Sequence, residues 1–187
     1  TIRRGLDCVF VRLQSASGIV FRYLREDRYS HANSHTFYLG YDGPLPATAA
    51  GRDVKVDITI REKVVFPIEQ RSVLRGYEEY ADLPDAAKLR VYSLDEVAVE
   101  KAVALMDRAR NEPRDLYDVW YMLEKGLIGF VDLKDAVEEK LEFRGRKLAD
   151  VRDEFQAKEV RFKKLWATRL SAQMASLPEF DGVFRSV

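Results

Sequence analysis

Residues 53–61 read DVKVDITIR, which is the clearest strand pattern in the chain. Polar and apolar side chains alternate along this stretch, with Val54, Val56, Ile58 and Ile60 on one face and Lys55, Asp57, Thr59 and Arg61 on the other. A period of two is typical of a strand with one buried face. The stretch therefore predicts a β-sheet in the first half of the chain.

The flanking segments predict the rest of the fold. Apolar side chains follow a helical period over residues 2–24, and shorter alternating patterns predict strands at 37–41 and 88–92. From Ser93 onward the pattern is helical, with helices predicted at about 93–110, 113–125, 132–143 and 147–176. Ser93 and Glu96 fit a capping box, in which both side chains bind free backbone N–H groups. This order predicts an α+β protein, with the sheet in residues 1–92 and an all-helical part in residues 93–187.

Composition limits the class of protein. The 187 residues include 31 basic and 31 acidic side chains, and 47% of the residues are hydrophobic, which excludes a disordered chain and a strongly basic nucleic-acid coat. A single cysteine, Cys8, excludes an internal disulfide and favours a reducing compartment, so we expect a cytoplasmic protein. No run approaches the roughly 18 apolar residues of a membrane span, which predicts that the chain has no membrane partner.

Asp57 is unusual at the centre of a strand, because aspartate is depleted there. One interpretation is a carboxylate that binds a hard cation, since such cations prefer oxygen ligands. The other is an exposed strand face on which Asp57 pairs with neighbours such as Lys55 and Thr59. The pattern alone favours the second interpretation and leaves the first open.

Lys101 lies inside the apolar arc of the helix predicted at 93–110, and Arg108 lies near the edge of that arc. Such a lysine either extends its ammonium to solvent or meets an anion in a site. The next helix begins with RDLYD at residues 114–118, where both aspartates suit a helix start. In one interpretation Arg114 and Asp118 form an i, i+4 pair, and in the other an aspartate meets Lys101 or Arg108.

The basic run from Arg144 to Lys164 holds eight basic and four acidic residues. A solvated helix face is the simpler interpretation of such a run. Contact with RNA phosphates is the alternative, because lysine and arginine neutralise the backbone.

Four motifs occur in a fixed order: KVDIT with RE at 55–62, YSLDEV at 92–97, EKAVAL at 100–105 and RDLYD at 114–118. In this order they resemble the AbiEii/AbiGii toxin family, whose members have a DNA polymerase β-like nucleotidyltransferase fold. The resemblance covers about residues 35–125. It implies that residues 1–92 form the C-terminal part of a nucleotidyltransferase-like domain.

The resemblance also implies an activity. Members of the family are metal-dependent toxins that transfer a nucleotide from an NTP to RNA, in several cases tRNA, and are paired with a separately encoded antitoxin. It implies Asp57, Lys101 and Asp118 as catalytic residues, with Asp57 as a ligand of Mg²⁺. Lys55, Arg108 and Arg114 are then candidates for nucleotide binding.

The family's first motif is a Gly-Gly-Ser/Thr turn followed by Asp-x-Asp, and no such sequence precedes Asp57. One carboxylate of three cannot hold two Mg²⁺ ions, so we expect these residues to be a truncated chain, inactive alone. The competing hypothesis is a non-catalytic binding domain that keeps the fold. A truncated sheet would leave an unpaired edge, which predicts a possible homodimer.

Overall fold

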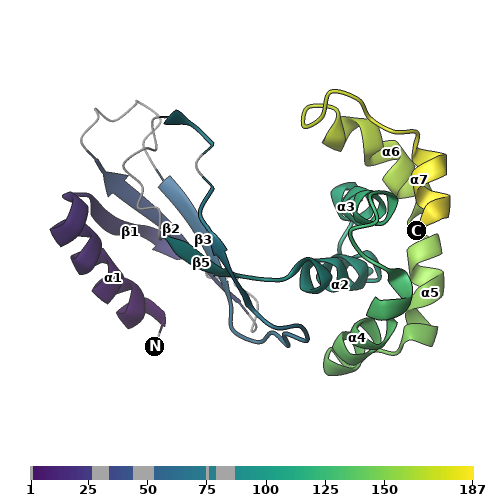
Figure 1. Ribbon diagram of the computed structural model, residues 1–187, viewed down its shortest axis with the longest axis horizontal. Helices are drawn as coiled ribbons and strands as arrows, with labels where there is room; N and C mark the ends of the chain where they lie inside the picture. Colours follow the sequence, from purple (N-terminus) through teal and green to yellow (C-terminus); the bar gives the residue numbers. More distant parts are fainter. Residues whose placement is uncertain (1, 27–33, 44–52, 75, 79–86) are drawn as a thin grey trace. The chain divides into compact units, whose positions relative to one another are not determined.

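The computed structural model describes residues 2–26, 34–43, 53–74, 76–78 and 87–187 (Figure 1). Within these residues, one helix, α1 (Ile2–Ser17), precedes five strands, and six helices follow the strands. This mixture of helices with antiparallel strands confirms the predicted α+β class.

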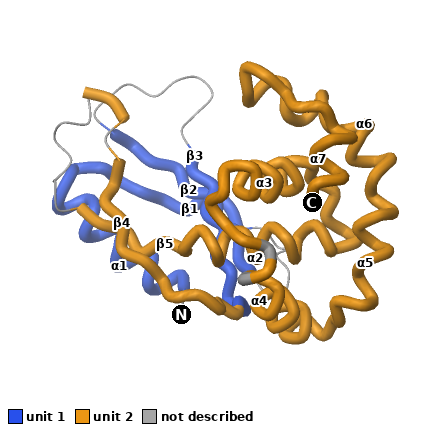
Figure 2. Tube along the Cα trace, turned by 45° about the vertical axis from the view of Figure 1, so that its right-hand side comes forward, with its two compact units in different colours: residues 1–62 blue, residues 63–187 orange. Residues whose placement is uncertain are grey.

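The chain divides into two compact units, residues 1–62 and residues 63–187, which Figure 2 colours separately. Strands β4 (Glu69–Ser72) and β5 (Lys88–Val91) belong to the second unit and pair with each other. The boundary predicted between residues 92 and 93 stays a prediction.

The first unit contains an antiparallel sheet in the order β1-β2-β3, built from β1 (Val20–Glu26), β2 (Ser34–Asp42) and β3 (Asp53–Thr59). Phe37 and Leu39 of the central strand are buried. Helix α1 packs on β1 through aromatic contacts, because the Phe10 ring lies 5.6 Å from the Phe21 ring and 5.3 Å from the Tyr23 ring. The predicted strands at 37–41 and 53–61 are thus found, with shifted ends.

The helix predicted over 2–24 is wrong beyond Ser17, because residues 20–26 form strand β1. Gly18 has φ of +71°, a conformation that glycine adopts readily and that ends a helix. After it, Phe21 and Tyr23 are partly buried while Val20 and Arg22 are exposed, so the true period is two. The helix was predicted to continue to residue 24 because Val20, Tyr23 and Leu24 also fit a helical spacing.

The second unit holds helices α2 (Leu94–Leu105), α3 (Pro113–Glu124), α4 (Phe130–Phe143), α5 (Leu148–Gln156), α6 (Glu159–Leu170) and α7 (Phe180–Ser186). Two clusters of buried apolar side chains form its core, one where α2 meets α4 and one where α3 meets α6 and α7. In the part of the chain that the structure describes, no helix is long and apolar enough to cross a membrane.

The helix predicted over 147–176 is two helices, α5 and α6, with Ala157 and Lys158 between them. Lys158 occupies the apolar stripe that includes Val151 and Phe162, and its side chain is buried. The short strand β4 and the last helix, α7, were both missed from the sequence. The EQRS of β4 carries no alternating apolar pattern to indicate a strand.

Half of the predicted capping box is present. The backbone N–H of Glu96 donates to Ser93 Oγ at 3.1 Å, as predicted. The Glu96 carboxylate, however, accepts the backbone N–H groups of Val65 and Phe66 at 3.0 and 2.8 Å. It turns into the core because a cation lies there, with Lys140 Nζ 2.6 Å from its second oxygen. Both side chains are almost fully buried, with exposures of 0% and 1%.

Candidate functional site

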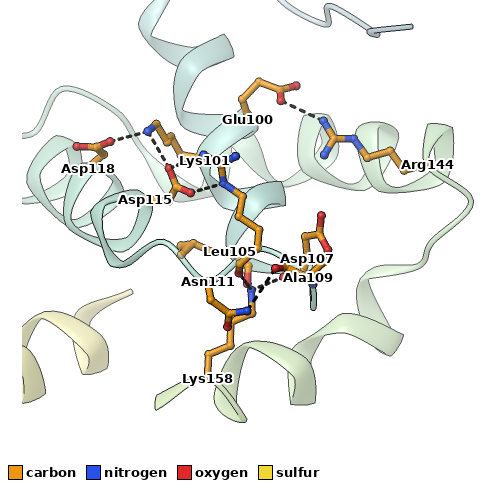
Figure 3. A network of polar contacts seen from close by, with 11 residues as sticks. Glu100, Lys101, Leu105, Asp107, Ala109, Asn111, Asp115, Asp118, Arg144 and Lys158 are labelled. Carbon is orange, nitrogen blue, oxygen red and sulfur yellow. Dashed lines mark hydrogen bonds and ion pairs between the residues drawn. The ribbon is translucent and has the colours of Figure 1, made fainter. Parts of the chain in front are cut away.

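Helices α2 and α3 bring together one lysine and two aspartates (Figure 3). Lys101 Nζ lies 2.8 Å from Asp115 Oδ1 and 2.6 Å from Asp118 Oδ2. Arg110, in the loop between the helices, donates from Nε to Asp115 Oδ2 at 2.5 Å and from a terminal nitrogen to Oδ1 at 3.3 Å. We call these four residues the lysine–aspartate cluster.

The local sequence explains why Asp115 lies at the centre of the cluster. Pro113 starts α3, where its missing N–H costs no helical hydrogen bond. Asp115 follows in the first turn, where the helix dipole favours a negative charge, and its backbone N–H donates to Glu112 O at 3.0 Å. Across from it, Lys101 projects from α2 beside the buried Ala98 and Ala102.

The side chains of the cluster differ in how much of their surface is exposed. The Asp115 side chain is 1% exposed, that of Lys101 is 25% exposed, and that of Asp118 is 40% exposed. Burial by itself would raise the pKa of Asp115, but hydrogen bonds from Arg110 and Lys101 outweigh it and lower that pKa. Burial would lower the pKa of Lys101, and its hydrogen bonds to the two aspartates raise it instead. Lys101 and Asp118 are therefore partly exposed to solvent, as is Arg110, whose side chain is 44% exposed.

The structure distributes the predicted arginines differently. Arg108 lies outside the cluster, with a side chain 81% exposed and Nε 3.9 Å from Glu154. Arg114 is exposed. The interpretation that pairs Arg114 with Asp118 is wrong, because Asp118 binds Lys101 and Arg114 has no ion-pair partner within the described ranges. Arg110 was missed, although it precedes the RDLYD motif by only four positions.

The loop that carries Arg110 is held by Lys158 from beneath (Figure 3). Lys158 Nζ donates to the backbone carbonyl oxygens of Leu105, Asp107 and Arg110 at 2.6, 2.5 and 2.8 Å. These carbonyls belong to the last residue of α2 and to the loop after it, where backbone acceptors lack helical partners. A buried ammonium thereby fixes the backbone from which Arg110 reaches Asp115.

Asp57 lies in β3 of the first unit and uses both oxygens within the sheet. Thr36, its cross-strand neighbour on β2, donates from Oγ1 at 2.5 Å, and Lys55 Nζ lies 2.9 Å away. These two hydrogen bonds, that of Thr36 first, lower the pKa of Asp57. The interpretation as an exposed, paired strand residue thus has direct support. Lys55 is placed as an ion-pair partner of Asp57.

The described residues do not by themselves form a site for Mg²⁺. Among them, no group of three or more His, Cys, Asp and Glu side chains lies close enough to hold a metal ion. Asp57 contributes one carboxylate, and Lys55 and Thr36 already occupy it. Mg²⁺ takes octahedral oxygen coordination and is usually held by one or two carboxylates together with waters and substrate phosphates, so Asp57 by itself supplies at most part of such a site.

Asp57 belongs to the first unit, and Lys101 and Asp118 belong to the second. That Lys101 and Asp118 lie together is a finding. That Asp57 acts in one catalytic site with them, as the family resemblance implies, stays a prediction.

A family model described as nucleotidyl transferase AbiEii toxin, type IV TA system, matches residues 10–186. The matched range includes every candidate residue named above and extends beyond the residues that carry the sequence resemblance. No curated protein and no solved structure matches the chain significantly.

Proposed function

The chain belongs to the AbiEii nucleotidyl transferase toxin family of type IV toxin–antitoxin systems, and we propose that it acts in the transfer of a nucleotide from an NTP to RNA, with tRNA as the acceptor. The observation that carries this proposal is the partly exposed pair of Lys101 and Asp118. These are two of the residues that the family resemblance links to activity. A cognate antitoxin is the protein partner that we propose.

Lys101 is suited to hold a phosphate group. An ammonium has three N–H donors, and Asp115 and Asp118 accept two of them. Within the described part of the chain the third donor has no acceptor, and the side chain is 25% exposed. Its raised pKa keeps Lys101 protonated at neutral pH, so it supplies a positive charge and not a general base.

Asp118 fixes the direction of that charge. One of its oxygens binds Lys101, and its side chain is 40% exposed, so it is also open to a substrate hydroxyl or amine. Asp115, on the buried side, holds Lys101 from the other direction. Two carboxylates thus orient one ammonium, which reduces the entropy that a flexible lysine loses when it binds phosphate.

Replacing Lys101 with methionine is expected to lower nucleotide transfer by about 10²–10³-fold, the usual cost of removing a positioned charge at developing negative charge. The assay measures incorporation of α-labelled NTPs into total tRNA by the protein made from its complete coding sequence. Lys134→Met, an exposed change on α4, is the matched control. Transfer at the wild-type rate by folded Lys101→Met protein would contradict a role for Lys101.

Asp57 is proposed as a further residue of the reacting site. Asp57→Asn is expected to lower transfer by about 10²-fold, as for other groups fixed at a reacting centre, and to leave the folded protein intact because the side chain is exposed. Asp53→Asn, on the same strand, is the control. Equal activity of the two variants in the transfer assay would remove Asp57 from the site.

A non-catalytic binding domain is the second candidate, and the pairing of Asp57 with Lys55 and Thr36 favours it. Titration calorimetry with each NTP in the presence of Mg²⁺ separates the two functions. Nucleotide binding that Lys101→Met weakens supports transfer. A folded protein that binds no NTP supports the hypothesis of a non-catalytic binding domain.

Sedimentation of the same sample tests the proposed homodimer, for which β1 and β3 are the edges of the described sheet.

A further inference from the structure

Helix α6, the end of α5 and the loop between α2 and α3 line two adjoining surface hollows of about 390 and 500 Å³. Asn111 and Arg161 line both of them, so the two hollows form one continuous depression. All of its lining residues belong to the second unit. We call this depression the α6 groove.

Basic side chains of α6 line the groove. Arg161, Lys164 and Arg169 are exposed and line the larger hollow, where Glu112 is the one acidic lining residue among those described. Arg161 and Lys164 are three residues apart and therefore neighbours on the helix surface, and Arg169 lines the same hollow. In the described chain none of the three has an ion-pair partner, whereas Lys163, which does not line the groove, binds Asp181 at 2.8 Å.

The loop adds a fourth cation. Arg108 lines the smaller hollow together with Asp153 and Glu154, and its side chain is 81% exposed with Nε 3.9 Å from Glu154. The backbone around Arg108 is fixed, because Lys158 binds the carbonyl groups of Asp107 and Arg110, and Arg146 donates to Met106 O at 2.8 Å. The backbone that carries Arg108 is therefore held in place by hydrogen bonds and is not a free loop.

The same loop joins the groove to the lysine–aspartate cluster. Arg108 and Asn111 line the groove, and Arg110, between them in sequence, binds Asp115 of the cluster. The groove and the cluster therefore share the backbone of residues 108–111. A chain with no net charge thus gathers in this groove three exposed cations, Arg161, Lys164 and Arg169, that have no ion-pair partner among the described residues.

We propose that the α6 groove binds backbone phosphates of the acceptor RNA and guides the RNA toward the cluster, an inference that rests on the proposed function. Arginine binds phosphate through a planar fork, and lysine binds it as a point charge. An acidic protein is the competing ligand. Protein interfaces need an apolar centre, and the apolar lining of the groove is only Ala109, Ala157 and Leu165.

The test changes three cations at once. Arg161→Gln, Lys164→Gln and Arg169→Gln are combined in one variant, and a control variant carries Lys125→Gln, Lys147→Gln and Arg152→Gln, three exposed cations of the same unit that lie outside the groove. Binding of fluorescein-labelled total tRNA is measured by anisotropy at several salt concentrations. Each lost phosphate contact lowers the slope of log K against log salt by about 0.7–0.9.

The groove variant is therefore expected to lose about two units of that slope and to bind tRNA at least 10-fold more weakly at 0.1 M salt, with the control variant close to wild type. Equal weakening by both variants, or none by either, would overturn the groove while leaving the proposed function in place. Loss of antitoxin binding with unchanged tRNA binding would assign the groove to the acidic protein and overturn the proposal. Absence of tRNA binding by the wild-type protein would overturn the RNA acceptor and, with it, this inference.

Discussion

Replacing Glu96 with alanine is expected to lower the free energy of unfolding by about 3–5 kcal/mol, the usual cost of removing one partner of a buried ion pair. The change leaves the Lys140 ammonium with Glu100 but without Glu96, in a site where the lysine is 1% exposed. It also leaves the N–H groups of Val65 and Phe66 without their acceptor. Chemical denaturation, followed by circular dichroism, measures the loss.

Two further variants keep the test informative if the Glu96→Ala protein does not fold. Lys140→Met is expected to cost less than Glu96→Ala, because the remaining carboxylate still accepts two backbone N–H groups. Lys134→Met, on the exposed side of α4, removes a lysine 3.9 Å from Glu138 and is expected to cost about 0–1 kcal/mol. Similar losses for Lys140→Met and Lys134→Met would contradict the importance of the buried pair.

Replacing Asp115 with asparagine is expected to lower the free energy of unfolding by about 2–3 kcal/mol, because an amide cannot satisfy both cations. The Asp115 carboxylate is 1% exposed and binds Arg110 and Lys101. We also expect nucleotide transfer to fall, since Lys101 loses one of the two groups that orient it. Thermal unfolding and the transfer assay measure the two effects.

The pH dependence gives an independent measurement of the same interaction. The pKa of Asp115 is lowered from its ordinary value of 3.8. As the pH falls, this carboxyl is therefore protonated at a higher pH in the unfolded chain than in the folded protein. The stabilisation is complete above the ordinary value and is lost as the pH falls through the lowered one. When the pH falls from above the ordinary value to below the lowered one, the free energy of unfolding is expected to decrease more for the wild type than for the Asp115→Asn protein.

Asp118→Asn is the matched control for Asp115→Asn. Its side chain is 40% exposed and binds the same lysine, so we expect it to cost less than 1 kcal/mol in stability. A loss of transfer with little loss of stability would assign Asp118 to the exposed, functional end of the cluster. The reverse result, with Asp118 the more destabilising change, would show that the gradient of burial does not govern these roles.

The elements with a regular apolar period were predictable. Strand β3 alternates over its whole length, and α2 begins where Ser93 marks a cap. Strand β1 was not predicted, because three of its apolar residues fit a helix as well as a strand. Only the conformation of Gly18 and the packing of Phe10 on β1 settle the choice, and neither is readable from a period.

The candidate site was predicted in part. The position of Lys101 in an apolar arc left two outcomes open, extension to solvent or contact with an anion, and the structure shows contact with two carboxylates. The sequence could not tell which aspartate it meets, because Asp115 and Asp118 are one helical turn apart and both reach it. Arg110 was missed because loop residues have no period, so its direction depends on the backbone that Lys158 holds.

The three carbonyl groups around Lys158 also make this lysine a chemical reporter. An ammonium that is buried and bound to backbone oxygens is shielded from acylating reagents, whereas Lys163 and Lys164, nearby on α6, are exposed. Acetylation of Lys158 therefore requires that the end of α2 and the start of α6 first separate. The rate of Lys158 acetylation relative to that of Lys163 and Lys164, measured by mass spectrometry, would report how often this local opening exposes the backbone that carries Arg108 and Arg110.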